Sequence, residues 1–266
     1  MVIHIILLCI GEIGTYMNEI MLYEELSMNA HPAIKTQVFD GWILRFANGY
    51  TNRANSVNMI YPSNLNPLRK IKFCEEIYTS QGLATVFKIT PLTVDVIDIS
   101  LEEKGYKKIT PTNLMISPIT KRDTPKAQII ITDTIDPKWQ KDYFRLNGIS
   151  DKIKIETDMI IQSNIQNKTL CATIIENETV VASGLCVVER EYAGLFDIIV
   201  DSNYRGKGLG VDICISLLNS AIKEGARYAY LQVVADNTPA VALYNKLGFT
   251  NCYQYWYRAK GNFRTL

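Results

Sequence analysis

The chain has 266 residues and a mass of 30.1 kDa, with 47% apolar and 21% charged residues, so it is long enough for two domains or one large one. Its 28 Lys and Arg against 27 Asp and Glu leave a net charge of +1, which excludes the broad basic field that holds nucleic acid. Both histidines, His4 and His31, lie near the N-terminus, which argues against a histidine-based triad or zinc site later in the chain.

The cysteines and the N-terminus indicate the compartment. Six scattered cysteines form no CxxC pair, so we expect buried thiols in a reducing compartment and no metal. The apolar start MVIHIILLCI lacks a basic leader and is too short to span a bilayer, so we expect a short strand or helix there. A cytoplasmic protein without membrane association follows. Alternatively, translation begins at Met17 or Met21 and residues 1–16 lie outside the native protein, which mass spectrometry of its N-terminus tests.

The first half shows alternating strand and helix patterns. Asn48-Gly49 lies between apolar stretches, as in a hairpin turn. Pro67 suits the first turn of a helix, and Gly82 and Gly105 are typical of helix ends. The predicted elements are a helix at 19–29, strands within 38–62, a helix at 67–80, a strand at 84–90, a helix at 94–105 and a strand at 113–119.

The second half continues this alternation. Residues 176–178, between two apolar runs, indicate a tight hairpin turn. The order of antiparallel strands followed by strand–helix–strand–helix–strand predicts a mixed sheet in an α/β fold. The predicted elements are a strand at 127–135, helices at 137–146 and 151–166, strands at 168–177, 179–189 and 192–200, a helix at 209–224, a strand at 227–235, a helix at 239–247 and strands within 249–260.

A polar seam at 117–128, with two prolines and mixed charges, has the composition of a linker. The halves on either side end alike, with EEKGYKKI near residue 105 and NKLGFTNC near residue 248. We therefore expect two domains, at 18–120 and 126–266, of which the first is a degenerate copy of the second. Ordinary helix-capping chemistry also produces a glycine and an aromatic residue after a helix, and is the alternative explanation.

The stretch that carries most chemistry is LFDIIVDSNYRGKGLG, at 195–210, in which a strand runs into a loop with three glycines at the start of a helix. Glycines let the backbone approach an anion, and the free N–H groups and dipole of the helix attract it. Arg205 and Lys207 add positive charge. The sequence thus predicts a phosphate-binding loop, although such turns also recur as plain connections in α/β folds.

The spacing of this loop decides among phosphate-binding families. Neither GxxxxGK[ST] nor GxGxxG is present, because the glycines are spaced GxGxG after an arginine. The segment resembles the coenzyme A pyrophosphate loop of the GCN5-related N-acetyltransferase superfamily. A second motif, ADNTPAVALYNKLGF at 235–249, is similar to the last helix of that superfamily. The resemblance covers the second half of the chain.

This resemblance implies a cofactor site for acetyl-CoA and no metal. Two parallel strands part, and the pantetheine arm fills the gap as an added strand; a backbone N–H there also polarises the thioester carbonyl. The implied cofactor-binding residues are Ile198, Ile199, Val200, Arg205, Gly206, Lys207, Gly208, Leu209, Gly210, Val211 and Asn237. The purely structural interpretation is that Tyr244 is a core residue of its helix and that Asn237 is the N-cap of that helix.

The resemblance also implies the proton transfers. Tyr244 is placed to protonate the leaving thiolate of CoA. Many relatives carry a glutamate as the base where this chain has Gln232, which takes no proton. Asp197 is the substitute by location, with Glu189, Glu191 or a water chain as alternatives. Asp197 can equally be a hydrogen-bonded residue of the sheet.

The segment at 41–57 is rich in polar residues for a hairpin. It is either a half-buried hairpin with surface arginines or a wall of the acceptor site of the second domain. It resembles the N-terminal portion of bacterial acetyltransferases built as two fused halves. The residues concerned are Trp42, Arg45, Thr51, Arg53 and Asn55.

The expected function is an N-acetyltransferase that moves acetyl from acetyl-CoA to a small-molecule or peptide amine. Direct attack is expected, because the chain offers no Ser–His or Cys–His pair for a covalent intermediate. Alternatives are a catalytically weak acyl-CoA sensor, suggested by Gln232, and a module that uses the first domain to bind RNA or protein. The near-neutral charge argues against RNA. We expect a monomer or homodimer with no nucleic acid partner.

Overall fold

The computed structural model describes the backbone of residues 2–261 and the side chains of residues 14–261. The chain divides into two compact units. Unit 1 comprises the chain up to Met28, Ala33–Pro111 and the chain from Tyr253 onward. Unit 2 comprises Asn29–Pro32 and Thr112–Cys252. The chain boundaries of the two units therefore differ from the polar seam at 117–128, and the end of the last strand belongs to unit 1. That the first half is a degenerate copy stays a prediction.

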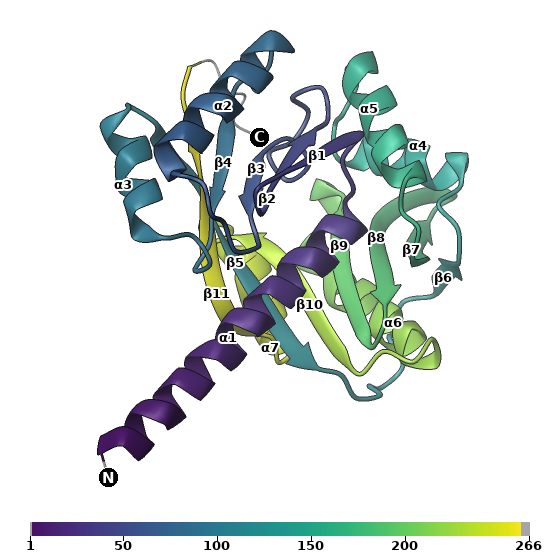
Figure 1. Ribbon diagram of the computed structural model, residues 1–266. Coiled ribbons are helices and arrows are strands. Elements are labelled where there is room, and N and C mark those ends of the chain that lie inside the picture. Colours follow the sequence, from purple (N-terminus) through teal and green to yellow (C-terminus); the bar gives the residue numbers. More distant parts are fainter. Residues whose placement is uncertain (1, 262–266) are drawn as a thin grey trace. The chain divides into compact units, whose positions relative to one another are not determined.

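Unit 1 is a five-stranded sheet segment with helices (Figure 1). Its strands follow the order β1-β2-β3-β4-β11, in which β3 and β4 are parallel and the other neighbours antiparallel. Apolar side chains of the sheet, α2 and α3 form its core, with Phe87 and Leu101 fully buried. The elements are α1 (Val2–Ala30), β1 (Lys35–Phe39), β2 (Trp42–Phe46), β3 (Val57–Met59), α2 (Pro67–Ser80), β4 (Val86–Ile89), α3 (Asp95–Glu103) and the end of β11 (Thr250–Ala259).

A buried ion pair joins three elements of unit 1. The Lys88 ammonium on β4 lies 2.7 Å from each carboxylate oxygen of Glu24 on α1. The Tyr253 hydroxyl on β11 donates to the same carboxylate at 2.7 Å. Glu24 is fully buried. Because a buried charge is costly without partners, this cluster fixes which side of α1 faces the sheet.

Two local expectations for the first half need correction. The tight turn of the first hairpin is Asp40-Gly41, with φ of 44° and 78°, rather than Asn48-Gly49. Asn48-Gly49 lies in the longer loop between β2 and β3. There the side-chain oxygen of Asn55 accepts from the backbone N–H groups of Ala47 and Gly49, and so replaces a two-residue turn with a side-chain-tied loop.

The N-terminal helix is the second correction. The expected helix at 19–29 is part of one helix that begins at Val2, so the apolar start is helical. Within the described residues, no helix is both long and apolar enough to cross a membrane.

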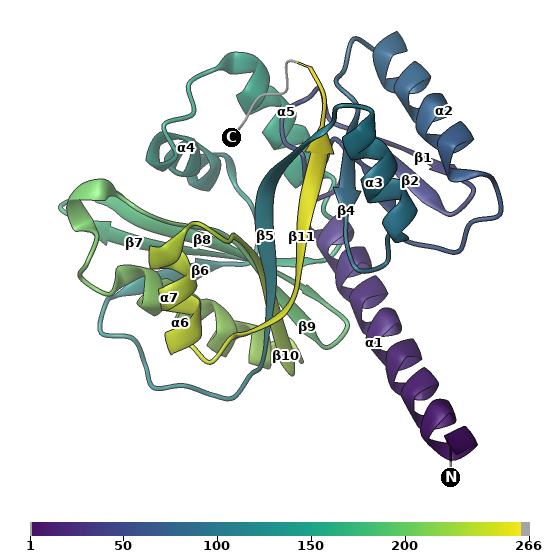
Figure 2. The ribbon, with the colours of Figure 1, turned by 90° about the vertical axis from the view of Figure 1, so that its left-hand side faces the viewer.

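Unit 2 holds a six-stranded mixed sheet in the order β5-β10-β9-β8-β7-β6, in which only the β9–β10 pair is parallel. Helix α6 packs on one face of this sheet and α4 on the other (Figure 2). The mixed α/β sheet predicted from sequence is confirmed. The elements are β5 (Lys107–Pro118), β6 (Ile129–Thr132), α4 (Pro137–Leu146), α5 (Lys152–Ser163), β7 (Lys168–Glu176), β8 (Thr179–Glu189), β9 (Tyr192–Val200), a 3-10 turn (Ser202–Tyr204), α6 (Leu209–Lys223), β10 (Tyr228–Val234) and α7 (Thr238–Lys246).

Candidate functional site

The two parallel strands of unit 2 pair over only part of their length. Their register runs from Tyr228 opposite Tyr192 to Leu231 opposite Leu195, and stops there. Beyond this point β9 continues to Val200 beside β8, and β10 continues to Val234 beside β5. The facing backbone edges of β9 and β10 are therefore not paired with each other past Leu195. Such a gap between two parallel strands is what the resemblance to the superfamily implies.

A bulge in β9 marks the same place. The register with β8 shifts between Ser183 and Leu185, opposite Asp197 and its neighbours. Asp197 itself has a φ of 53°, which is the left-handed region that few non-glycine residues adopt. A bulge bends its strand and turns side chains in a new direction. It thus helps β9 leave its parallel partner.

A cleft of about 610 Å³ opens beside the end of β9, between the start of α6 and α7. It brings together residues that are far apart in the sequence, and most of the predicted cofactor residues line it. The predicted residues on its wall are Ile198, Ile199, Val200, Arg205, Gly206, Gly208, Leu209, Gly210, Val211, Asn237 and Tyr244.

The glycine loop gives this cleft its anion-binding character. Gly206 and Gly208 have φ of 78° and 87°, and an added Cβ at either would meet nothing within 4 Å. Gly208 is the N-cap of α6, and no side chain caps the helix there. The first N–H groups of α6 are therefore free of a side-chain acceptor at the wall of the cleft, where the helix dipole favours an anion. Arg205 is held beside them by a 3.2 Å hydrogen bond from its Nε to the Val200 carbonyl.

Helix α7 forms the opposite wall. Asn237 caps it, with its side-chain oxygen accepting from the Ala240 N–H at 3.3 Å. Tyr244 is half-buried on the cleft wall, and its ring packs edge-on against Phe249 with centroids 6.0 Å apart. The two walls meet closely at Gly210, where an added Cβ would lie 2.9 Å from a methyl of Leu243. The small residue at position 210 is therefore a packing requirement between the helices.

Two predicted site residues lie away from the wall of this cleft. The ammonium of Lys207 sits over the Tyr204 ring, 4.5 Å from its centroid. The carboxylate of Asp197 lies 3.4 Å from the hydroxyl of Tyr143, which comes from α4. The structure therefore places Asp197 near the helix on the opposite face of the sheet from α6.

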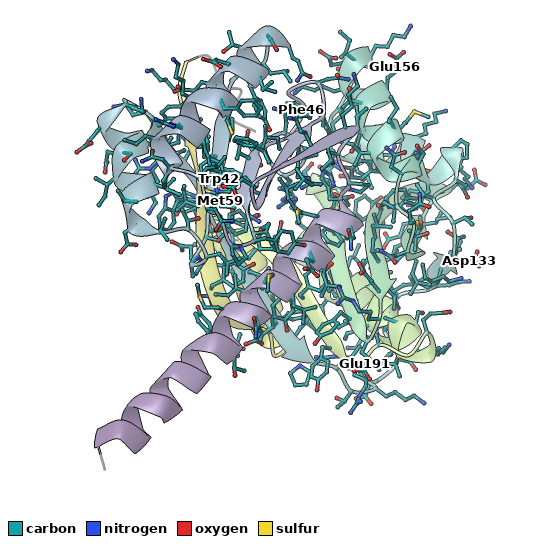
Figure 3. The ribbon with its side chains drawn as sticks, in the orientation of Figure 1. Trp42, Phe46, Met59, Asp133, Glu156 and Glu191 are labelled. Atoms are coloured by element: carbon teal, nitrogen blue, oxygen red, sulfur yellow. The ribbon has the colours of Figure 1, made fainter. Side chains whose placement is uncertain are left out.

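The alternative bases are engaged elsewhere. Glu189 accepts from the side-chain amides of Asn29 and Asn167 at 3.1 and 3.0 Å. Glu191 pairs with Arg227 at 2.9 Å and is labelled in Figure 3. Both residues flank the turn before β9, at the far end of that strand from Val200. Neither lines the cleft. Gln232 is half-buried on β10, where its register partner is Leu114 of β5.

Sequence reasoning missed several residues on the cleft wall. Three of them, Pro239, Leu243 and Lys246, recur at the spacing of one helical face of α7. That periodicity, read together with Asn237 and Tyr244, could have found them. The others are Tyr204, Ala240 and Ala242. Among the described residues, no group of three or more His, Cys, Asp or Glu side chains could hold a metal ion.

The polar residues of the 41–57 segment have structural contacts within unit 1. Arg45 is buried, and its guanidinium donates to the backbone carbonyls of Arg53 and Met28. Burial lowers the pKa of Arg45 to about 10, which leaves it charged at neutral pH. Trp42 is buried in the core. Arg45 is therefore not a surface arginine, which corrects that detail of the half-buried hairpin interpretation.

Comparisons with known proteins identify the family of the chain. A family model described as "Probable histone acetyltransferase Rv0428c C-terminal" matches residues 18–258. The uncharacterized N-acetyltransferase YobR of Bacillus subtilis is 29% identical over 250 residues, which cover 92% of this chain and 100% of that protein. The [ribosomal protein bS18]-alanine N-acetyltransferase of Escherichia coli is 34% identical over 87 residues, which cover 33% of this chain and 59% of that protein.

Solved structures show the same fold. A GCN5-related N-acetyltransferase from Kribbella flavida superposes with a TM-score of 0.67 at 10% identity, over 91% of this chain and 95% of that chain. A tandem GNAT protein from the clavulanic acid biosynthesis pathway has a TM-score of 0.63 at 11% identity, over 77% and 74% of the two chains. The chain therefore belongs to the acetyltransferase family of the Rv0428c C-terminal domain, within the GCN5-related N-acetyltransferase superfamily.

Proposed function

We propose that the protein transfers an acetyl group from acetyl-CoA to an amine, with the cofactor held in the cleft of unit 2. One observation carries this proposal. The two parallel strands part after Leu195 and Leu231, directly beside a helix start whose N-cap is a left-handed glycine. An extended pantetheine arm needs the first feature, and a diphosphate needs the second.

The residues that would hold the cofactor divide along its length. The N–H groups of the loop and first turn, from Gly206 to Gly210, would receive the diphosphate, with Arg205 adding charge, whereas the Val211 N–H already donates to the Gly208 carbonyl at 2.9 Å. The free edge of β9 at Ile198–Val200 would hydrogen-bond the pantetheine amides as an added strand. One N–H of that edge would also donate to the thioester oxygen as negative charge develops on it.

The chemical step is direct attack of a neutral amine on the thioester carbon. The new C–N bond forms as the C–S bond breaks, the amine loses a proton, and the thiolate of CoA takes one. An alkylamine has a pKa near ~10.4, so about one molecule in a few thousand is neutral at pH 7. Tyr244, on the cleft wall, would protonate the thiolate, since a phenol keeps its proton at neutral pH.

The proton of the amine needs its own acceptor. Asp197 is our proposed base, because it lies at the bulge of β9, where the pairing with β10 has ended. Its contact with the Tyr143 hydroxyl would place the amine on the α4 side of the sheet. A chain of water molecules that ends at solvent is the alternative, and it needs no carboxylate.

Binding of acetyl-CoA, measured by calorimetry, tests the proposal. Gly208→Val should weaken binding at least about tenfold, because a β-branched residue strains the φ of 87° and adds bulk to the anion site. Gly225→Val is a matched control. Gly225 follows the other end of α6 with a φ of 91° and nothing within 4 Å of an added Cβ. No binding by the unaltered protein at millimolar acetyl-CoA would refute the proposal, as would equal losses in both variants.

A second candidate function is a sensor that binds acetyl-CoA without turnover. The observation that favours it is Gln232, an amide at the position where we expect the catalytic glutamate of the superfamily. A screen of amines that detects free CoA separates the two candidates. Release above background with any amine supports the enzyme, whereas tight binding with no release across the panel supports the sensor.

A further inference from the structure

Unit 1 repeats the strand and helix order that builds the cleft of unit 2. In unit 1 the order is β3–α2–β4–α3, and in unit 2 it is β9–α6–β10–α7. The first strand of each set pairs antiparallel with the strand before it and parallel with the strand after its helix. In unit 1 the parallel pairing covers only Val57 with Phe87 and Asn58 with Lys88. The parallel strands of unit 1 therefore also pair over only a short stretch.

A second cleft, of about 460 Å³, lies at the corresponding place in unit 1. Its wall includes Ile60 and Tyr61 after β3, Pro67 at the start of α2, and Ile97 in α3. The cleft of unit 2 has the same plan, with its wall formed by the end of β9, the start of α6 and α7. The same sheet geometry has thus produced two clefts, one in each unit.

The loop of the second cleft has no glycine, and its helix start is already capped. Asn66 is the N-cap of α2, and its side-chain oxygen accepts from the N–H groups of Leu68 and Arg69 at 3.0 and 3.4 Å. Pro67 at the first helical position has no N–H to offer. The donors that attract an anion at the start of α6 are therefore used or missing at the start of α2.

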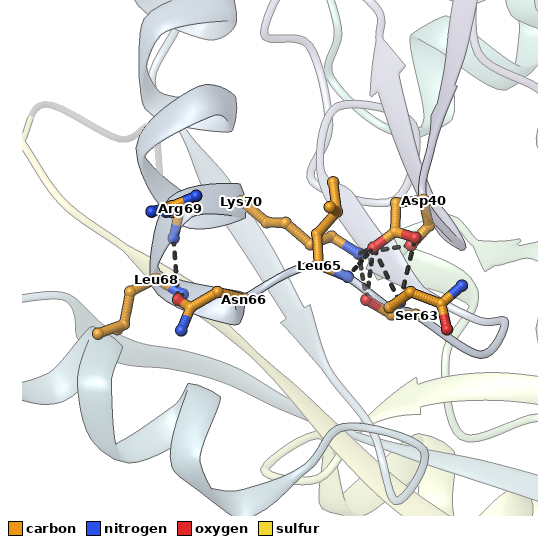
Figure 4. Close-up of polar contacts among 8 residues, drawn as sticks. Asp40, Ser63, Leu65, Asn66, Leu68, Arg69 and Lys70 are labelled. Atoms are coloured by element: carbon orange, nitrogen blue, oxygen red, sulfur yellow. Dashed lines mark hydrogen bonds and ion pairs between the residues drawn. The ribbon is translucent and has the colours of Figure 1, made fainter.

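The remaining donors of this loop bind a carboxylate of the same unit (Figure 4). Asp40, from the first hairpin turn, accepts from the N–H groups of Asn64 at 3.1 Å and Leu65 at 2.9 Å. It also accepts from the Ser63 hydroxyl at 2.8 Å and pairs with the Lys70 ammonium at 3.0 Å. Two backbone amides, a hydroxyl and an ammonium around one negative group are the arrangement that a bound phosphate requires. Asp40 therefore occupies the anion position of the loop.

The turn that carries Asp40 is fixed in this position. A Cβ at Gly41 would lie 2.2 Å from the Pro62 carbonyl oxygen and 2.5 Å from the Tyr61 carbonyl oxygen. The turn thus packs directly on the backbone that leaves β3. Lys70, in turn, is fully buried, with its ammonium 4.2 Å from the centre of the Trp42 ring. An external diphosphate would have to displace a half-buried carboxylate that is already paired with these donors.

The rest of the cleft is mostly apolar. Three thioethers, from Met17, Met21 and Met59, line it together with Trp42. Trp42 and Met59 are register partners on β2 and β3, and Figure 3 shows them next to each other. Thioethers make favourable contacts with aromatic rings and adapt to their shape. A ligand with a ring therefore fits these walls better than a plain polar molecule.

The side chains of Tyr61, Ser63 and Thr93 on the cleft wall have partners within unit 1, and Asn18, on the same wall, is exposed. The Tyr61 hydroxyl donates to Glu25 at 3.0 Å, and the Thr93 hydroxyl oxygen accepts from the Thr90 N–H at 3.1 Å. Nothing on this wall requires a charged ligand. A cavity of a few hundred Å³ with apolar and aromatic walls is the usual form of a small-molecule site.

We propose that the cleft of unit 1 is a second ligand site, which takes an uncharged molecule with an aromatic ring and excludes CoA because Asp40 fills its anion position. This site is independent of the proposed function, since it concerns another cleft and needs no acetyl-CoA. Its ligand would bind at the walls formed by the three methionines and Trp42.

Fluorescence titration with N-phenyl-1-naphthylamine, an uncharged aromatic probe, tests the site in the full-length protein. We expect saturable binding of one probe per chain, with energy transfer from tryptophan because Trp42 lines the cleft. Met21→Glu should weaken the binding at least about tenfold, because a carboxylate would be desolvated against the ligand. Met17→Glu is a second variant with the same expected effect. Val96→Glu is the control, since Val96 is 55% exposed on α3 and does not line the cleft.

The outcomes separate this inference from the proposed function. Saturating CoA should leave the bound probe in place, and both methionine variants should keep the acetyl-CoA affinity of the unaltered protein. Displacement of the probe by CoA would overturn the inference, as would the absence of saturable binding or equal binding by Met21→Glu, Met17→Glu and Val96→Glu. Failure to bind acetyl-CoA would refute only the proposed function.

Discussion

Tyr244 has a packing contact and a proposed catalytic role, which involve different parts of its side chain. Its ring packs edge-on against Phe249, which is nearly fully buried, and the residue lines the cleft of unit 2. The ring contact belongs to the fold, whereas the hydroxyl is the group proposed to protonate the thiolate. A substitution that keeps the ring and removes the oxygen therefore tests the chemistry without disturbing the packing.

Tyr244→Phe should lower kcat about a hundredfold or more, as removal of a general acid does, and leave the affinity for acetyl-CoA within about twofold. Steady-state release of free CoA measures the first effect, and calorimetry the second. Tyr204→Phe is the control, because Tyr204 lines the same cleft but has no proposed role in proton transfer. Equal kcat for Tyr244→Phe and the unaltered protein would remove the acid role.

Asp40 gives unit 1 a pH dependence whose sign can be worked out. Backbone N–H groups and the Lys70 ammonium hold the pKa of Asp40 well below its ordinary 3.8. A carboxyl whose pKa is depressed by folding contributes stability above its unfolded pKa, and loses it as the pH falls toward the folded value. The difference in thermal midpoint between the unaltered protein and Asp40→Asn should therefore be constant above about pH 5 and shrink below pH 3.8. A difference that stays constant down to pH 2 would contradict this.

At the scale of elements, β9 shows how one strand can pair and part with the same neighbour. Gly194 lies where β9 still pairs with β10, opposite Tyr230. An added Cβ there would lie 2.6 Å from ring atoms of both Phe196 and Tyr230. The paired half of the strand thus depends on a missing side chain, while the bulge at Asp197 begins the unpaired half.

Gly194→Ala should therefore destabilise the protein by about 1–3 kcal/mol, the usual cost of overpacking a core. Urea unfolding measures the change. Gly14→Ala is the matched control with the opposite sign, because Gly14 lies within α1 with nothing within 4 Å of an added Cβ, and alanine favours a helix by up to about 1 kcal/mol. A neutral Gly194→Ala would show that the two rings move aside.

The elements also show what sequence patterns can and cannot predict. Sequence patterns placed the helices with strong end signals well. The bounds of α4, for example, agree with the prediction at both ends. The glycine loop was found because its residues are contiguous in the sequence. The hairpin turn was misplaced, because Asn48-Gly49 and Asp40-Gly41 both satisfy the local rule, and only Asn55, seven residues after Asn48, decides between them. The sequence analysis also did not predict that Asp40 binds the loop before α2. Asp40 is distant in sequence from the backbone amides that donate to it, so no local pattern connects them.

At the scale of the molecule, unit 1 depends on contacts between segments at opposite ends of the chain. Glu24 near the start, Lys88 in the middle and Tyr253 near the end meet in one buried cluster. Contacts so far apart in sequence cannot be read from local periodicity, which is why the predicted boundaries kept the last strand with the second half. The buried pair within this cluster can be tested directly.

Lys88→Met should lower the free energy of unfolding by about 3–5 kcal/mol, because it leaves the buried Glu24 carboxylate without its counter-charge. Adding Glu24→Leu to this variant should restore much of the loss. Lys72→Met is the control, since the Lys72–Glu76 pair is 3.9 Å apart and largely exposed, and should cost less than about 0.5 kcal/mol. Urea unfolding of the four proteins measures these differences. Equal losses for Lys88→Met and Lys72→Met would show that the buried pair contributes little.

The last strand has a consequence for synthesis of the protein on the ribosome. Residues Trp256–Ala259 of β11 pair with β4, although β4 is translated long before them. Domains usually fold in the order in which they emerge, the N-terminal one first. Here the nascent N-terminal unit keeps an open sheet edge until β11 is translated, so its sheet is completed only after unit 2 has been synthesised.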